Sequence, residues 1–163
     1  MQWDLISDVI LTTSFAALAM FAVLGLYQLI KHRSLKKVDK PLLWAILPLF
    51  LMAATYIIFD KFFVLNTRPN GSGEASFPST HVMVVATIFS IISIILPKYI
   101  KSRASRIILD FMMLALLALV CVARVLASMH WVSDVVGGLI FAAIFAAIYY
   151  LTTRRYKNGQ HLH

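Results

Sequence analysis

Residues 9–30, VILTTSFAALAMFAVLGLYQLI, form an apolar run that contains no charged side chain. A helix of this length extends about 33 Å at 1.5 Å per residue, enough to cross the roughly 30 Å of hydrocarbon in a bilayer. The run is too long for a cleaved signal peptide, and Asp4 and Asp8 before it are acidic where such a peptide is basic. We therefore expect a permanent membrane-spanning helix here.

Four further apolar stretches follow the first one. They cover Pro41–Phe59, Val82–Leu96, Ile107–Val122 and Val135–Leu151. The last three are shorter than the roughly 20 residues that a span needs, but polar residues at their ends and a thinner local bilayer accommodate the difference. With 61% hydrophobic residues and a mean hydropathy of +0.84, the chain has too much apolar surface for a soluble monomer. The prediction is an all-α, polytopic membrane helix bundle of about five spans, one domain over residues 1–163.

Positive charge is concentrated in segments that alternate with the spans. Residues 31–40, residues 97–106 and the tail after residue 151 hold most of the Lys and Arg side chains. The positive-inside bias predicts that these segments are cytoplasmic, which places residues 60–80 and 128–133 on the extracytoplasmic face of a cell membrane. The net charge of +8 is divided among short loops with no aromatic platform, which argues against a nucleic-acid partner.

Three polar clusters punctuate the apolar chain, and all three fall on the predicted outer face. They are Lys61 with Arg68-Pro69, then Pro78-Ser79-Thr80-His81, then Arg124 with His130 and Asp134. Each has a structural explanation when it is taken alone, such as headgroup anchoring by Lys61 or helix-dipole pairing by Asp134. Ionisable groups at a membrane edge are costly unless they are paired or used. Their accumulation on one face therefore indicates a functional site.

The chemistry of these clusters suits an anion. Lys61, Arg68 and Arg124 are permanent cations, and arginine adds a planar fork of donors that matches phosphate oxygens. Ser79 or Thr80 can cap the third span, whose free N–H groups favour an anion. His130 and Asp134 are four residues apart, so the carboxylate can orient the imidazole as in the base-and-orienter part of a catalytic triad.

The order and spacing of the clusters resemble the three-part signature of the type-2 phosphatidic acid phosphatase superfamily, over a motif-bearing core from residue 61 to 138. This superfamily includes integral membrane lipid phosphatases, soluble acid phosphatases and vanadium haloperoxidases, and the apolar spans select the first group. The chain departs from the usual pattern of this superfamily in three respects. Thr80 stands where glycine is commonest, Ala123 stands where serine often precedes the arginine, and membrane members usually have six spans.

The resemblance implies a reaction that needs neither metal nor cofactor. His130 would be the nucleophile, forming a phosphohistidine intermediate, Asp134 would orient it, and His81 would protonate the leaving oxygen. Water would then release inorganic phosphate. The implied phosphate-binding residues are Lys61, Arg68, Ser79, Thr80 and Arg124.

The substrate is less well defined by the motifs. The segment Ser76-Phe77-Pro78-Ser79 and an outward site resemble small bacterial members that dephosphorylate undecaprenyl diphosphate during recycling of the cell-wall carrier. Phosphatidylglycerophosphate, phosphatidic acid and lipid A phosphates are alternatives, and a lipid phosphotransferase would use the same residues. A non-catalytic transporter or scaffold is disfavoured because the spans contain little polarity beyond Asp110 and Pro48, which is expected to kink the second span.

Overall fold

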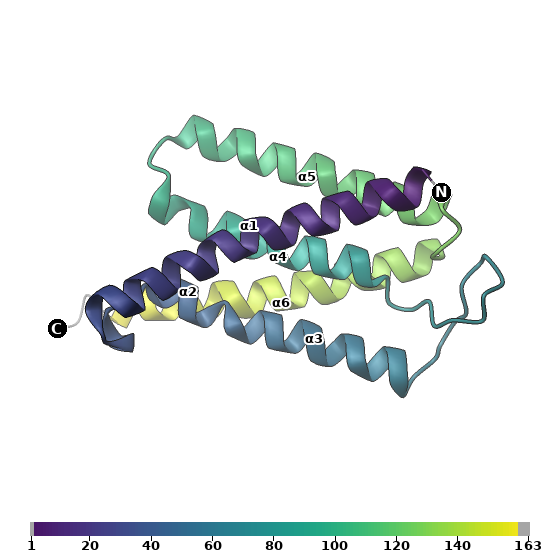
Figure 1. Cartoon of the computed structure of the whole chain (residues 1–163), viewed down its shortest axis with the longest axis horizontal. Helices are drawn as coiled ribbons and strands as arrows, with labels where there is room; N and C mark the ends of the chain where they lie inside the picture. The colour runs from purple at the N-terminus through teal and green to yellow at the C-terminus, as the bar shows by residue number, and fades with distance from the viewer. Residues whose placement is uncertain (1, 160–163) are drawn as a thin grey trace.

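A computed structural model describes residues 2–159 as a bundle of helices that run alternately up and down (Figure 1). The elements in chain order are α1 (Gln2–His32), η1 (Leu35–Lys37), α2 (Lys40–Trp44), α3 (Ile46–Lys61), α4 (Thr80–Tyr99), α5 (Arg103–Leu126) and α6 (Val132–Gly159). The C-terminal His161-Leu162-His163 lies outside the described residues. The predicted all-α fold is confirmed for the described part of the chain.

Five segments are long and apolar enough to cross a membrane, as predicted. They are Gln2–His32, Lys40–Lys61, Thr80–Tyr99, Arg103–Leu126 and Val132–Arg154. The stretches that looked short in the sequence are extended by the polar residues at their ends, so that each reaches at least 20 residues. The chain is therefore a multi-pass membrane protein.

Helix α4 is the centre of the bundle. Its most apolar segment is 67% buried, compared with 11% for the corresponding segments of α1 and α5, and α6, α1, α5 and α3 all pack against it. The outer helices keep large apolar side chains on the surface, among them Leu26, Phe50 and Phe111. Such exposure is costly in water but neutral where lipid is the solvent. The central position of α4 fixes the residues at its N-terminus, which belong to the second polar cluster.

The second span is broken at Ala45, between α2 and α3. Pro48 has no N–H and cannot donate to the carbonyl of Trp44 four residues earlier, and its ring crowds that carbonyl. Helix α2 accordingly ends at Trp44. The expected irregularity at the proline is present, as a break placed one turn before it.

The basic segments lie together at one end of the bundle, where α1, α4 and α6 finish and α5 begins (Figure 1). Asp39 connects α1 and α4 at this end. Its carboxylate accepts hydrogen bonds from the Tyr99 hydroxyl (2.6 Å) and the Gln28 amide (3.0 Å), and it forms an ion pair with Lys98. Burial alone would raise the pKa of Asp39, but these hydrogen bonds and the Lys98 charge outweigh burial and lower the pKa.

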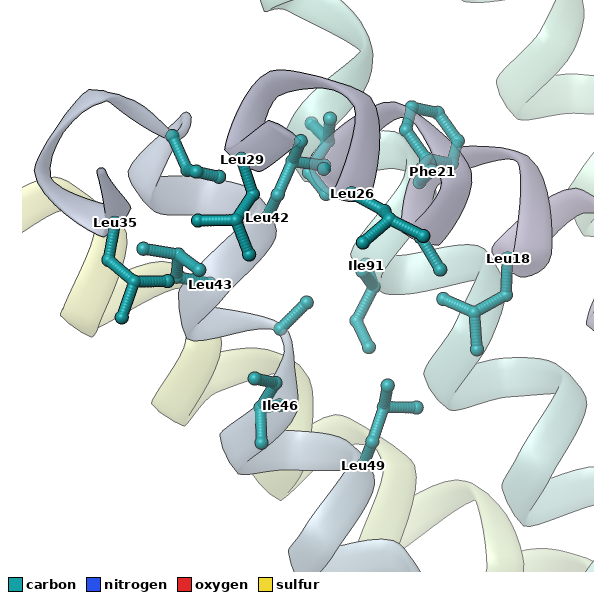
Figure 2. Close-up of a pocket in the computed structure, with 15 residues that line it drawn as sticks. Leu18, Phe21, Leu26, Leu29, Leu35, Leu42, Leu43, Ile46, Leu49 and Ile91 are labelled. Atoms are coloured by element: carbon teal, nitrogen blue, oxygen red, sulfur yellow. The ribbon is translucent and has the colours of Figure 1, made fainter. Parts of the chain in front are cut away.

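An apolar cavity of about 380 Å³ lies between α1, α2, α3 and α4 (Figure 2). Its lining residues on α1 run from Leu18 to Leu29, in the half of that helix nearer the basic end. Figure 2 shows Leu18 and Phe21 of α1, Leu42 and Leu49 of the second span, and Ile91 of α4 around this space. All of its lining side chains are apolar or absent, as at Gly25.

The connection between α3 and α4, residues 62–79, folds back on itself above the other end of the bundle (Figure 1). Thr67 and Ala75 form an isolated antiparallel bridge, and Gly71 turns the chain with a φ of 77°, a conformation that favours glycine. The indole N–H of Trp131 donates to the Thr67 carbonyl at 2.9 Å. This bond fastens the loop to the beginning of α6.

Candidate active site

The three polar clusters meet at the end of the bundle opposite the basic segments. A backbone hydrogen bond joins the second cluster to the third, with the Ser79 N–H donating to the Asp134 carbonyl (2.9 Å). Within the third cluster, the His130 N–H donates to the Arg124 carbonyl (3.3 Å). Arg68 approaches from the loop, with its Nη1 atom 3.7 Å from the sulfur of Met129. The starts of α4 and α6, the end of α5 and the loop therefore surround one site.

His130 is buried and has a defined tautomer. Its side chain is 4% exposed, and its Nδ1 atom lies 2.8 Å from the main-chain carbonyl oxygen of Ser76. Because a carbonyl oxygen can only accept, Nδ1 must carry the hydrogen. The lone pair of the neutral ring is then on Nε2, which is the atom available for nucleophilic attack.

Asp134 does not bond His130 directly, which corrects the expected pairing. The Nδ1 and Oδ2 atoms are 3.9 Å apart, too far for a hydrogen bond. Instead, Oδ2 accepts the Ser76 hydroxyl at 2.5 Å and the Trp131 N–H at 2.9 Å, so that the fully buried carboxylate also caps the start of α6. Asn66 adds a longer bond of 3.4 Å to the other oxygen.

Ser76 is the residue that the sequence interpretation missed at this site. Its hydroxyl oxygen lies 3.3 Å from His130 Nδ1 and donates to Asp134, while its carbonyl accepts from the same nitrogen. Ser76 is 1% exposed. The carboxylate therefore acts on the imidazole through Ser76. The only sequence signal was the position of this serine two residues before Pro78.

Burial controls the protonation of His130. Desolvation, reinforced by the positive charge of Arg124, lowers the pKa of His130 from 6.5 to about 4. The ring is consequently neutral at pH 7, the state that a nucleophilic nitrogen requires.

This shift can be measured by NMR titration of histidine-labelled protein, with a His130→Gln variant to assign the signal. We expect the His130 signal to titrate near pH 4. The unfolded chain would protonate this residue at about 6.5, so protein stability should fall as the pH decreases from about 6.5 towards 4. A His130 signal that titrates near 6.5 would contradict the proposed burial effect.

Three buried polar atoms at this end have no hydrogen-bond partner within residues 2–159: Arg68 Nε, Ser79 Oγ and Arg124 Nε. Leaving a buried donor unpaired costs about 1–3 kcal/mol, more for a charged group. All three belong to residues predicted to bind phosphate. The cluster thus has unused donors of the kind that an oxyanion accepts from.

Ser79 occupies the N-cap position of α4 but its side chain makes no capping hydrogen bond. The expected cap is therefore wrong in its detail, and the hydroxyl is left for another acceptor. Thr80 is the first residue of α4 and is partly buried. The unpaired N–H groups of the first helical turn add a partial positive charge beside these residues.

The remaining predicted cations are less enclosed. Arg68 pairs with Glu74 at 2.7 Å and its side chain is 27% exposed. Lys61 is 71% exposed and its ammonium forms an ion pair with the neighbouring Asp60 at 2.8 Å, so it is not part of the buried cluster.

Helix α1 brings two carboxylates to the site that the sequence interpretation did not place there. Asp8 Oδ1 lies 2.8 Å from His81 Nε2, and Asp4 Oδ1 accepts from Arg124 Nη1 at 2.6 Å. Ser7, between them on the helix, lies 3.2 Å from the same Nη1.

Two glycines let α6 approach the start of α4. A Cβ atom on Gly138 would lie 2.8 Å from the main-chain oxygen of Ser79, and one on Gly137 would lie 2.3 Å from the ring of Phe77. Neither space accommodates a side chain without movement of the backbone or the aromatic ring.

Gly138→Ala is therefore expected to separate α6 from α4 and to destabilise the protein by about 1–3 kcal/mol, the usual cost of overpacking. Thermal unfolding in detergent measures the loss. Gly25→Ala is the matched control, because its Cβ atom would contact Leu42 at an ordinary 3.6 Å. Equal melting temperatures for the two variants would show that the close approach at Gly138 is unimportant.

The fold and this site define a membrane-embedded helical protein with a buried histidine and unpartnered phosphate-type donors at one end. A family model described as the PAP2 superfamily matches residues 55–157. The chain therefore belongs to the PAP2 superfamily, which confirms the family that its motifs resemble. A comparison with curated proteins gives no match.

Among solved structures, the chain is similar to the "first transmembrane PAP2 type phosphatidylglycerolphosphate phosphatase from Bacillus subtilis". The TM-score is 0.71 at 17% sequence identity, and the alignment covers 92% of this chain and 76% of that chain. At this identity the similarity establishes the fold. The chain thus has the fold of a membrane phosphatase of the PAP2 superfamily.

Proposed function

We propose that the protein hydrolyses the phosphate or diphosphate headgroup of a membrane lipid through a phosphohistidine intermediate. The observation that carries this proposal is the neutral, buried His130, whose Nδ1–H is held by Ser76, beside the unpartnered donors of Arg68, Ser79 and Arg124. A nucleophile and a set of donors for charged oxygens are the two components that phosphoryl transfer requires.

The proposed reaction has two displacements at phosphorus. Nε2 of His130 attacks, a P–N bond forms, and the P–O bond to the leaving group breaks while His81 donates a proton to the departing oxygen. A water molecule, which returns a proton to His81, then attacks phosphorus, the P–N bond breaks with its electrons returning to Nε2, and inorganic phosphate leaves. The Arg68 and Arg124 guanidinium groups and the Ser79 hydroxyl stabilise the equatorial oxygens in both steps.

We propose that this reaction needs no metal ion, because the arginine cations and the N-terminus of α4 supply positive charge around the phosphoryl group. Activity of the purified protein should consequently persist in EDTA. Its complete loss in EDTA, with recovery on addition of Mg²⁺, would contradict the metal-free reaction.

A lipid is the favoured substrate class because the site lies at the end of an apolar bundle and an apolar cavity lies farther along the same helices (Figure 2). Asp8 and Leu18 are ten residues apart on α1, about 15 Å along the helix. A long hydrocarbon chain attached to a headgroup in the site is long enough to span this distance. We propose that the site faces the extracytoplasmic side of the cell membrane, because the opposite end carries the basic segments.

Two lipids are the leading candidates for the substrate. Undecaprenyl diphosphate is proposed from the resemblance of Ser76-Phe77-Pro78-Ser79 and the outward site to small bacterial members. Phosphatidylglycerophosphate is the second, favoured by the fold similarity to a phosphatase named for that lipid.

The test is an assay of purified protein in detergent against undecaprenyl diphosphate, phosphatidylglycerophosphate and phosphatidic acid, with release of inorganic phosphate as the readout. We expect release from at least one lipid and a clear preference among the three. Transfer of label to an acceptor lipid without phosphate release would indicate a phosphotransferase. No turnover of any phosphorylated lipid would reject the proposed function.

A further inference from the structure

We propose that α1 supplies two positioning residues for this reaction: Asp8, which orients His81, and Asp4, which orients Arg124. This inference rests on the proposed function and extends it to a helix that lies wholly outside residues 55–157, the segment matched by the family model. It gives the site a direct carboxylate–histidine contact, in addition to the indirect link from Asp134 to His130 through the Ser76 hydroxyl.

The Asp8–His81 pair has the geometry of an orienting contact. The 2.8 Å distance joins Asp8 Oδ1 to Nε2 of His81, whose side chain is 21% exposed, while that of Asp8 is 53% exposed. A carboxylate on one ring nitrogen fixes the plane of the imidazole and provides a counter-charge for its protonated form. The other nitrogen, Nδ1, is then the atom that can give its proton to the leaving oxygen.

The Asp4–Arg124 pair leaves free the edge of the guanidinium that suits a phosphate group. Asp4 and Ser7 both engage Nη1, at 2.6 and 3.2 Å. The N–H of Nε points to the opposite edge, where it forms a fork with Nη2 that matches two phosphate oxygens. Arg124 Nε is buried and has no partner within residues 2–159. Asp4 thus holds one edge of the arginine while the other edge stays available.

The spacing of these residues on α1 explains how one helix serves two partners. Ser7 and Asp8 follow Asp4 by three and four positions, so both lie near Asp4 on one side of the helix. This face contacts both α4, which carries His81, and α5, which carries Arg124. Ser7 is fully buried, and Ser14 two turns later is also fully buried, which fixes the rotation of α1.

A contrary interpretation is that the two carboxylates occupy the phosphate position and must leave when substrate binds. The two interpretations predict opposite effects of neutralisation. Positioning carboxylates make phosphate binding and proton transfer more effective, so their removal weakens both. Competing carboxylates hinder an anion, so their removal strengthens its binding.

Asp8→Asn is tested with two leaving groups. Turnover of a lipid phosphate, whose alkoxide leaves poorly, should decrease about 10- to 100-fold, less than the roughly 10²- to 10⁴-fold that a general acid itself contributes, because Asp8 acts only through His81. Turnover of an activated aryl phosphate should change less than about 3-fold, because its leaving group needs little protonation. The double variant with His81→Ala should be no slower than His81→Ala alone. An equal decrease for both leaving groups, no decrease, or additive losses would overturn the role of Asp8.

Asp4→Asn is tested with orthovanadate, an analogue of the phosphoryl group. Its dissociation constant, measured by the thermal stabilisation that it confers on the protein, should increase about 10-fold, as expected when a charge-assisted contact is weakened. Unchanged or tighter vanadate binding would overturn the role of Asp4. This measurement needs no lipid substrate, so it is separate from a failure of the proposed function, in which the unsubstituted protein would hydrolyse none of the lipids.

Asp110→Asn is the control for both variants. It removes the same charge from α5, but Asp110 is exposed and lies towards the opposite end of the bundle. We expect leaving-group dependence and vanadate binding equal to those of the unsubstituted protein. Shifts in Asp110→Asn that match those of Asp4→Asn or Asp8→Asn would show that net charge alone is responsible, and would overturn the proposal.

Discussion

His130→Ala is expected to reduce lipid phosphatase activity to below about one part in 10⁴ of its original value, the size of loss seen when a covalent nucleophile is removed. The physical reason is that His130 is a buried, neutral ring whose tautomer is fixed by the Ser76 carbonyl, which leaves a lone pair on Nε2. The measurement is phosphate release from a lipid substrate, together with trapping of a labelled phosphoenzyme that is stable in base and labile in acid.

Folding must be separated from chemistry in this experiment. Removing the imidazole leaves the buried Ser76 carbonyl unpaired, which costs about 1–3 kcal/mol, so the melting temperature of the variant is measured in the same detergent. His32→Ala is the matched control, since His32 is exposed in the last turn of α1 at the other end of the bundle. Robust turnover or phosphoenzyme formation by folded His130→Ala protein would refute the assigned nucleophile.

Arg124→Ala is expected to produce the second largest effect, a loss of about 10²- to 10³-fold in kcat, the range reported for deletion of one preorganised donor to a developing oxyanion. Arg124 is 4% exposed by its side chain and is the most enclosed of the predicted cations. Its substitution removes the buried Nε and leaves the Asp4 carboxylate without its cation.

Two further variants make this result specific. Arg124→Lys keeps a positive charge but loses the fork of donors, so it should recover only a small part of the activity. Arg106→Ala removes an arginine from the other end of α5, where its Nη1 donates to the Ile100 carbonyl at 2.9 Å, and should retain activity if the protein folds. Full activity in Arg124→Lys would show that charge alone is required at this position.

The membrane-spanning helices and the ends at which the clusters gather could be predicted from the sequence, because apolar length and basic loops are local properties of the chain. Runs such as residues 9–30 need no knowledge of their neighbours to be recognised as spans. The order of the spans then places Arg68, His81 and His130 at the same end, because consecutive spans alternate in direction.

The relation between His130 and Asp134 could not be predicted in the same way. A spacing of four places two side chains together on a helix, but α6 begins at Val132, so His130 lies in the preceding turn where helical spacing does not apply. The contacts of Asp4 and Asp8 were equally inaccessible. They join residues 120 and 73 positions apart, and only the packing of α1 against α4 and α5 determines them.

Ser76 contacts His130, the proposed nucleophile, through two separable routes, one through its main chain and one through its hydroxyl. The carbonyl that selects the His130 tautomer belongs to the peptide unit, so it would survive replacement of Ser76 by any residue that preserves the path of the loop. The hydroxyl alone transmits the charge of Asp134. Substitutions of Ser76 are therefore expected to change the reactivity of the imidazole in small steps. The path of the backbone would still decide which ring nitrogen of His130 keeps its lone pair.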